Sequence, residues 1–132
     1  MTICALSSAP GSSGVAVIRI SGPETKNLIK KLIKKELPRP RMATLLELYN
    51  INNSSLIDEG IVLWFPAPNS YTGEDMAELH VHGSRGVIRE IQNNLLSTDK
   101  CRMAEAGEFT KIAFVNGKIN LLKAEAIGDL IA

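Results

Sequence analysis

The sequence predicts an α+β fold, in which a mixed β-sheet carries about three packed helices. Some short apolar stretches alternate with a period of two, as in strands, while others place apolar residues at helical spacing. The two kinds do not follow the strict alternation of a doubly wound parallel sheet. The chain has 132 residues, of which 45% are apolar, so it is long enough for one globular domain with its own core.

The first half of the chain contains four expected strands and one helix. We expect strands at residues 2–6, 15–22, 43–49 and 57–65, and a loop of small residues at 7–14. The helix, at 23–35, places its apolar residues on one stripe, made of Leu28, Ile29, Leu32 and Ile33. Ser21 and Glu24 have the spacing of a capping box, so we expect them to cap its first turn.

The other faces of this helix carry a lysine cluster, made of Lys26, Lys30, Lys31, Lys34 and Lys35. Such a cluster is most often a solvated face, and a nucleic-acid surface is the less favoured interpretation. The net charge of the whole chain is only +1. Composition therefore argues against a general nucleic-acid or membrane binder.

The strand expected at 76–82 alternates between two faces. Its apolar face is made of Ala77, Leu79 and Val81, and its polar face of Glu78, His80 and His82. Two imidazoles on one strand face could begin a metal site, but Cys4 or Glu78 would have to complete it. We therefore expect no metal.

The last third of the chain contains three expected helices and one weak strand, at 100–104. Residues 83–86 open a helix whose stripe is Val87, Ile88, Ile91 and Leu95. A short helix at 105–115 should end at Asn116-Gly117. The helix from 120 onward has an apolar stripe with no later sequence to pack against, made of Leu121, Ala124, Ile127, Leu130 and Ile131. We expect it to need a partner, either a second copy or the rest of a larger protein.

The two cysteines, Cys4 and Cys101, lie far apart and outside any CxxC spacing. We interpret them as reduced, buried thiols of a cytoplasmic protein. The first residues lack the basic region of a signal peptide, and no apolar run approaches the length of a membrane span.

Common catalytic motifs do not match this sequence. Residues 11–14, Gly-Ser-Ser-Gly, lack the gap and the Lys-Ser/Thr ending of a phosphate-binding loop. Neither Ser70 nor Ser84 lies in a nucleophile elbow or a Ser-His-Asp order. We therefore expect no catalytic residue here.

The loop between the strands at 57–65 and 76–82 is stiff and charged. Pro66 and Pro68 restrict its backbone, and three carboxylates follow within five residues, Glu74, Asp75 and Glu78. This combination favours a binding loop over an ordinary solvated connection.

Three charges lie in apolar or tightly turned sequence. Arg19 stands between Ile18 and Ile20, Glu78 lies in mid-strand, and Lys118 follows a glycine. A charge among apolar neighbours is costly to bury unless it is paired. Either these charges bind a polar ligand in one pocket, or Arg19 simply lies on the solvent-exposed face of its strand.

Several long motifs, taken together, resemble one known family. They lie at residues 2–3, 10–22, 64–66, 68–75, 78–79, 82–83, 106–110, 113–118 and 122–127. Over essentially the whole chain they resemble the N-terminal part of the MnmE (also TrmE) family of tRNA modification GTPases. Serines in the loop at 7–14 and the turn at 50–55 depart from the family pattern.

The resemblance implies a folate-binding and dimerisation domain at 1–118, similar to the tetrahydrofolate-binding domain of aminomethyltransferases. It also implies that 119–132 begin a central helical domain whose remainder is missing here. The expected ligand is 5-formyl-tetrahydrofolate, and the expected partners are a second copy, the flavoprotein MnmG (GidA) and a tRNA whose wobble uridine is modified. The GTPase domain, with its GTP, potassium and magnesium, is expected outside this chain, so we expect no GTP hydrolysis from this chain alone.

By position, Arg19, Glu78 and Lys118 match the folate-contacting residues of the family. A carboxylate such as Glu78 suits the paired N–H donors of a pterin edge, and the two cations suit the anionic tail and the formyl oxygen. The resemblance also implies that residues 71–73 line or cover the pocket.

Two alternatives to this function remain. The chain could be a dimerisation module with a vestigial folate pocket. It could also be a free-standing aminomethyltransferase-like enzyme, although the charged loop contains no activated nucleophile or strong general base.

Overall fold

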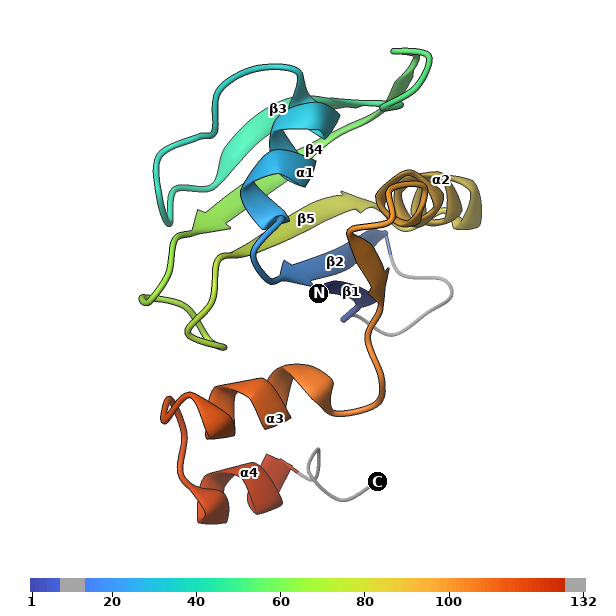
Figure 1. The fold of residues 1–132 in the computed structure, drawn as a ribbon. Coiled ribbons are helices and arrows are strands. Elements are labelled where there is room, and N and C mark those ends of the chain that lie inside the picture. The colour runs from blue at the N-terminus through green and yellow to red at the C-terminus, as the bar shows by residue number, and fades with distance from the viewer. Residues whose placement is uncertain (8–13, 128–132) are drawn as a thin grey trace.

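The computed structural model describes residues 1–7 and 14–127, which form a six-stranded mixed sheet and four helices (Figure 1). The strands are β1 (Thr2–Leu6), β2 (Val15–Ser21), β3 (Thr44–Tyr49), β4 (Leu56–Phe65), β5 (Met76–His82) and β6 (Cys101–Met103). The helices are α1 (Thr25–Ile33), α2 (Arg85–Leu96), α3 (Glu108–Val115) and α4 (Leu121–Ile127). The α+β class and every expected element are confirmed within these residues. Residues 8–13 of the expected loop of small residues lie outside the described residues, as do Leu130 and Ile131 of the last expected helix.

The sheet has the strand order β3-β4-β5-β2-β1-β6. All neighbouring strands are antiparallel except β1 and β6, which are parallel. The two central strands, β2 and β5, are therefore neighbours although about 60 residues separate them. Any charge in the middle of β2 comes to lie beside the middle of β5.

Helices α1 and α2 pack on one face of the sheet and form the core with it (Figure 1). The expected stripe of α1 is confirmed, because Leu28, Ile29, Leu32 and Ile33 are at most 2% exposed. They pack with side chains of β2, β5 and α2, among them Ile18, Ile20, Leu79, Ile91 and Leu95. Burying each side chain of this size contributes about 1.5–3 kcal/mol, so this face contributes strongly to folding.

The alternation expected in β5 is also confirmed. Ala77, Leu79 and Val81 belong to the core, whereas Glu78 and His80 are half-buried on the opposite face. That opposite face is the one that α1 and α2 do not cover, and it carries the candidate site.

The expected capping box is wrong. Ser21 is the last residue of β2, and α1 begins at Thr25 without a side-chain cap. The backbone N–H of Glu24 donates instead to Oγ1 of Thr2, at 2.8 Å. Pairing of Ser21 with β1 and β5 keeps it in the sheet, and Gly22 (φ 137°) makes the turn into the helix.

The end of α3 is confirmed at Asn116-Gly117. Gly117 has φ 71°, and its N–H donates to Phe114 O at 3.0 Å. The N–H of Lys118 donates to Ala113 O at 2.8 Å. These two bonds form a Schellman motif, which places Lys118 at a defined position after the helix.

Helix α4 packs beside α3 at the end of the molecule away from β3 (Figure 1). Ala124 is buried, but Leu121, Leu122 and Ile127 are 51%, 77% and 44% exposed. Much of the α4 surface therefore has no partner within the described chain. No helix among the described residues combines the length and apolar character that crossing a bilayer requires.

Cys4 and Cys101 are buried free thiols on the neighbouring strands β1 and β6. This confirms the expectation of buried, unpaired cysteines. A hydrogen bond with Cys101 and burial both raise the pKa of the Cys4 thiol.

Candidate functional site

Arg19 and Glu78 form an ion pair on the uncovered face of the sheet. They are directly opposite residues of β2 and β5, and Nη2 of Arg19 lies 3.2 Å from Oε2 of Glu78. Their side chains are 30% and 21% exposed. Arg19 therefore does not simply point into water. Pairing offsets the cost of holding both charges in a half-buried position.

Two aromatic rings lie near the Arg19 guanidinium. Its central carbon is 5.7 Å from the ring centroid of Tyr71 and 5.8 Å from that of Phe109. Both distances allow cation–π attraction. The Nε atom of Arg19 is buried and has no hydrogen-bond partner among the described residues. A buried donor without a partner is costly, so this atom is an unsatisfied polar group beside the ion pair.

Glu78 also contacts a second residue of its own strand. Nε2 of His80 lies 3.0 Å from Oε1 of Glu78, while Nη2 of Arg19 donates to Oε2. A carboxylate offers about four acceptor positions, so each oxygen retains capacity for one more donor.

The loop between β4 and β5 uses its other two carboxylates to hold itself in place. The hydroxyl of Ser21 donates to Oε1 of Glu74 at 2.8 Å and lies 2.8 Å from Oγ1 of Thr72. Oδ1 of Asp75 accepts the N–H of Ala67 at 2.8 Å. Glu74 and Asp75 therefore have structural roles in this loop, which leaves Glu78 as the carboxylate of the candidate site.

Helix α3 fastens this loop from the other side. Nδ2 of Asn116 donates to Thr72 O at 2.8 Å, and the hydroxyls of Tyr71 and Thr110 are 2.9 Å apart. A side chain at Gly73 (φ 84°) would meet Asn116 and the stem of Lys118 at 3.3–3.4 Å. Glycine thus allows the loop to rest on the end of α3.

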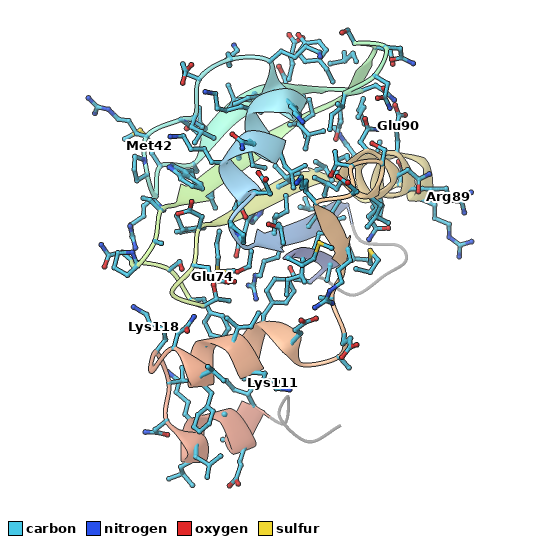
Figure 2. All side chains as sticks on the ribbon, in the orientation of Figure 1. Met42, Glu74, Arg89, Glu90, Lys111 and Lys118 are labelled. Atoms are coloured by element: carbon cyan, nitrogen blue, oxygen red, sulfur yellow. The ribbon has the colours of Figure 1, made fainter. Side chains whose placement is uncertain are left out.

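Lys118 lies on the α3–α4 connection (Figure 2). Its Nζ donates to Pro68 O at 3.0 Å. It lines a shallow hollow of about 610 Å³, which we name the Arg41–Lys118 hollow, made of Arg41, Phe65, Asn69, Ser70, Tyr71 and Lys118. Tyr71 is common to this hollow and to the surroundings of Arg19.

The three residues singled out in the sequence thus have different placements. The structure pairs Arg19 with Glu78 and places Lys118 in the hollow, with Tyr71 between the two sets of contacts. That all three bind one ligand stays a prediction. The sequence reasoning missed Arg41, Phe65 and Phe109; Phe65 and Phe109 lay in motifs that could have indicated them, whereas Arg41 did not.

A second hollow, of about 630 Å³, lies beside α3 and contains Glu74, Glu105, Glu108 and Lys111 (Figure 2 labels Glu74 and Lys111). Its three carboxylates against one ammonium group give it a net negative charge. An anionic ligand is therefore better suited to the Arg41–Lys118 hollow.

The two histidines of β5 both have carboxylate neighbours. Nδ1 of His82 lies 2.8 Å from Oδ1 of Asp58, and His80 lies beside Glu78. Burial raises the pKa of Asp58, but hydrogen bonds from His82 and Glu59 outweigh it, so the pKa is lowered overall. Among the described residues, no three metal-ligating side chains gather at one point.

Comparison with known proteins shows close relatives. Residues 2–118 match the family described as "GTP-binding protein TrmE N-terminus". The chain is 59% identical, over 132 residues, to the tRNA modification GTPase MnmE of Pelagibacter ubique (strain HTCC1062), with 100% of this chain and 30% of that protein covered. It is 51% identical over 131 residues to the MnmE of Brucella ovis, covering 99% of this chain and 29% of that protein.

A eukaryotic relative matches over the same region. The chain is 47% identical over 136 residues to the mitochondrial tRNA modification GTPase gtpbp3 of Dictyostelium discoideum. This match covers 98% of the chain and 27% of that protein. The chain thus spans about 30% of the length of the curated relatives that it matches.

Proposed function

The chain belongs to the TrmE N-terminal family, and we propose that it is the folate-binding and dimerisation module of a GTPase that modifies the wobble uridine of tRNA. The names of its relatives support the tRNA modification part of this proposal. The folate part depends on the contacts of Arg19, Glu78 and Lys118.

One observation carries the folate assignment, namely the half-buried Arg19–Glu78 pair, whose side chains remain 30% and 21% exposed. A pterin is a flat heterocycle that presents adjacent N–H donors on one edge and acceptors on others. The spare acceptor positions of Glu78 suit the N–H edge, and the exposed part of the Arg19 guanidinium suits an acceptor. The rings of Tyr71 and Phe109 offer apolar surface beside the heterocycle.

When bound, 5-formyl-tetrahydrofolate would supply a one-carbon unit. In this proposal, Glu78 orients the pterin, Arg19 donates to it, and Lys118 holds an anionic or carbonyl oxygen of the ligand. Tyr71 shields the ligand from water. GTP, potassium, magnesium, the flavoprotein MnmG and the tRNA would engage the complete protein, since the present chain spans about 30% of its relatives.

Dimerisation is the second part of the proposal. Apolar side chains are exposed on the sheet face that α1 and α2 do not cover, such as Val15 (52%) on the central strand β2 and Leu45 (60%) on the edge strand β3. Helix α4 adds Leu122 (77%). An apolar surface of this kind favours a protein partner. Light scattering at tens of micromolar should give the mass of a dimer, and a monomer would contradict this part.

The finer organisation is also proposed here. Residues 1–118 would resemble the folate-binding domain of aminomethyltransferases, and residues 119–132 would begin the central helical domain. The buried free thiols Cys4 and Cys101 fit a reducing, cytoplasmic location.

Calorimetric titration of the chain with 5-formyl-tetrahydrofolate tests the folate assignment. We expect saturable binding, and no heat change at near-millimolar ligand would contradict it.

The runner-up function is a dimerisation module with a vestigial pocket. One observation favours it, because both oxygens of Glu78 already have partners, Arg19 and His80. A dimer that does not bind folate would establish this alternative.

A further inference from the structure

We propose that the Arg41–Lys118 hollow is a carboxylate subsite that selects folates by their glutamate tail, with Arg41 as its second cation. This inference rests on the proposed folate-binding function. It adds a binding residue, Arg41, and a ligand preference, for polyglutamylated over tail-less pterins.

Two cations converge on the hollow from distant parts of the chain. Nζ of Lys118 donates to Pro68 O at 3.0 Å, and Nη2 of Arg41 donates to Asn69 O. Because these two carbonyls belong to consecutive residues, the cationic heads lie over the same short stretch of backbone. Neither cation pairs with a carboxylate in the described part of the chain.

Both cations retain donors for a ligand. An arginine has five N–H donors and an ammonium group has three, whereas each uses one here. Their present partners are neutral carbonyl oxygens, which do not balance the charge. A carboxylate would form stronger, charge-assisted hydrogen bonds with the same groups.

The backbone and ring around Arg41 restrict where its side chain lies. Its N–H donates to Trp64 O at 2.8 Å, and its guanidinium carbon lies 5.9 Å from the ring centroid of Phe65. A guanidinium held by a ring and a carbonyl loses less freedom when it binds an anion.

Tyr71 connects this hollow with the Arg19–Glu78 pair. Its ring lies 5.7 Å from the Arg19 guanidinium, and its side chain lines the hollow. A ligand with a heterocyclic head at Arg19–Glu78 and a carboxylate tail at Arg41 and Lys118 would therefore lie across Tyr71. A folate has this order of groups, with an aromatic linker in the middle that suits the Tyr71 ring.

The test compares three ligands that differ only beyond the pterin. They are 5-formyl-tetrahydrofolate, its triglutamate, and a 5-formyl-tetrahydropterin without the aminobenzoyl-glutamate tail. Titration calorimetry of the wild-type chain should rank triglutamate above monoglutamate, and the tail-less pterin at least about tenfold weaker than either.

The Arg41→Gln variant should bind both tailed ligands about tenfold more weakly and leave the affinity for the tail-less pterin unchanged. Arg39→Gln is the matched control. It removes the same charge two residues away, from an exposed side chain outside the hollow, and should change none of the three affinities.

Salt dependence gives a second measurement that needs no variant. Raising the salt from about 0.05 to about 0.5 M should weaken binding of the tailed ligands and spare the uncharged tail-less pterin, because exposed ion pairs are screened. Equal salt dependence, or equal affinity for all three ligands, would overturn the tail subsite while leaving the proposed function intact. Failure of all three ligands to bind would instead overturn the proposed function.

Discussion

Arg19 and Glu78 stand directly opposite each other on β2 and β5, with Nη2 and Oε2 3.2 Å apart, although 59 positions separate them in the chain. The register of the two central strands produces this pair. Because both side chains lie on the face that α1 and α2 leave uncovered, the pair is available to a ligand as well as stable in its absence.

Replacing either member of the pair should affect ligand binding more than folding. Glu78→Gln and Arg19→Gln should each weaken 5-formyl-tetrahydrofolate binding about tenfold or more. Each should cost only about 0.2–1 kcal/mol of unfolding free energy, because the pair is partly exposed. Calorimetry and urea denaturation measure the two effects.

Glu59→Gln is the control for these variants, because Glu59 is an exposed acid of β4. It should leave both binding and stability unchanged. Unaltered folate affinity in Glu78→Gln would remove Glu78 from the site.

Two glycines in open surroundings should respond oppositely to alanine. Gly117 has a left-handed φ of 71°, whereas Gly86 lies in the first turn of α2 without a left-handed φ. At both positions, an added Cβ would have no other atom within 4 Å. Gly117→Ala should destabilise the protein by about 1–2 kcal/mol, because alanine disfavours the left-handed region. Gly86→Ala should stabilise it by about 0.5–1 kcal/mol.

Denaturation curves of the two variants test this contrast. Gly117→Ala should also weaken folate binding, since Lys118 follows directly in the Schellman motif. Equal stability changes in the two variants would show that the C-terminal turn of α3 is not held as described.

The Asp58–His82 contact should make stability depend on pH. Hydrogen bonds from His82 help to lower the pKa of Asp58 below its usual value of 3.8, so the ionised form is favoured by folding. Its contribution is therefore present above about pH 4 and is lost as the pH falls through the folded-state pKa. Asp58→Asn should thus be less stable than the wild type near neutral pH, and the difference should shrink as the pH falls below about 4.

Urea denaturation at several pH values measures this difference. Asp99→Asn changes an exposed acid and should show no such pH-dependent gap. A constant gap between Asp58→Asn and wild type at all pH values would contradict the proposed ionisation effect.

The two thiols should be protected in the folded state. Cys4 and Cys101 are 0% and 6% exposed, so burial keeps a reagent from both thiols. The pKa of Cys4 is raised, whereas a hydrogen bond with Cys4 lowers the pKa of Cys101, so the protection of Cys101 comes from burial alone. A thiol reagent should react slowly with the native protein and rapidly with both groups in guanidinium chloride. Adding an exposed thiol with Asn93→Cys should give one rapid reaction, and rapid reaction of native Cys4 would contradict the buried placement.

Much of the fold could be predicted because it depends on neighbouring residues. The alternation of β5 and the stripe of α1 follow from periods of two and 3.6, and both are confirmed. The Asn116-Gly117 end of α3 follows from local turn chemistry and is confirmed as well.

The Ser21–Glu24 capping box failed for a related reason. Its spacing was correct, but β2 extends to Ser21 and uses its hydroxyl to hold Thr72 and Glu74. A local pattern does not reveal that a residue has a stronger partner about 50 positions away.

By itself, the sequence determined which segments form strands and helices, which faces are apolar, and which family the chain resembles. Only the tertiary structure decided that Arg19 faces Glu78, that Glu74 fastens a loop, and that Arg41 joins Lys118 at one hollow. The physical reason is the range of the interactions. Periodicity and turns depend on residues a few positions apart, whereas strand register and loop docking depend on contacts between segments that the chain separates widely.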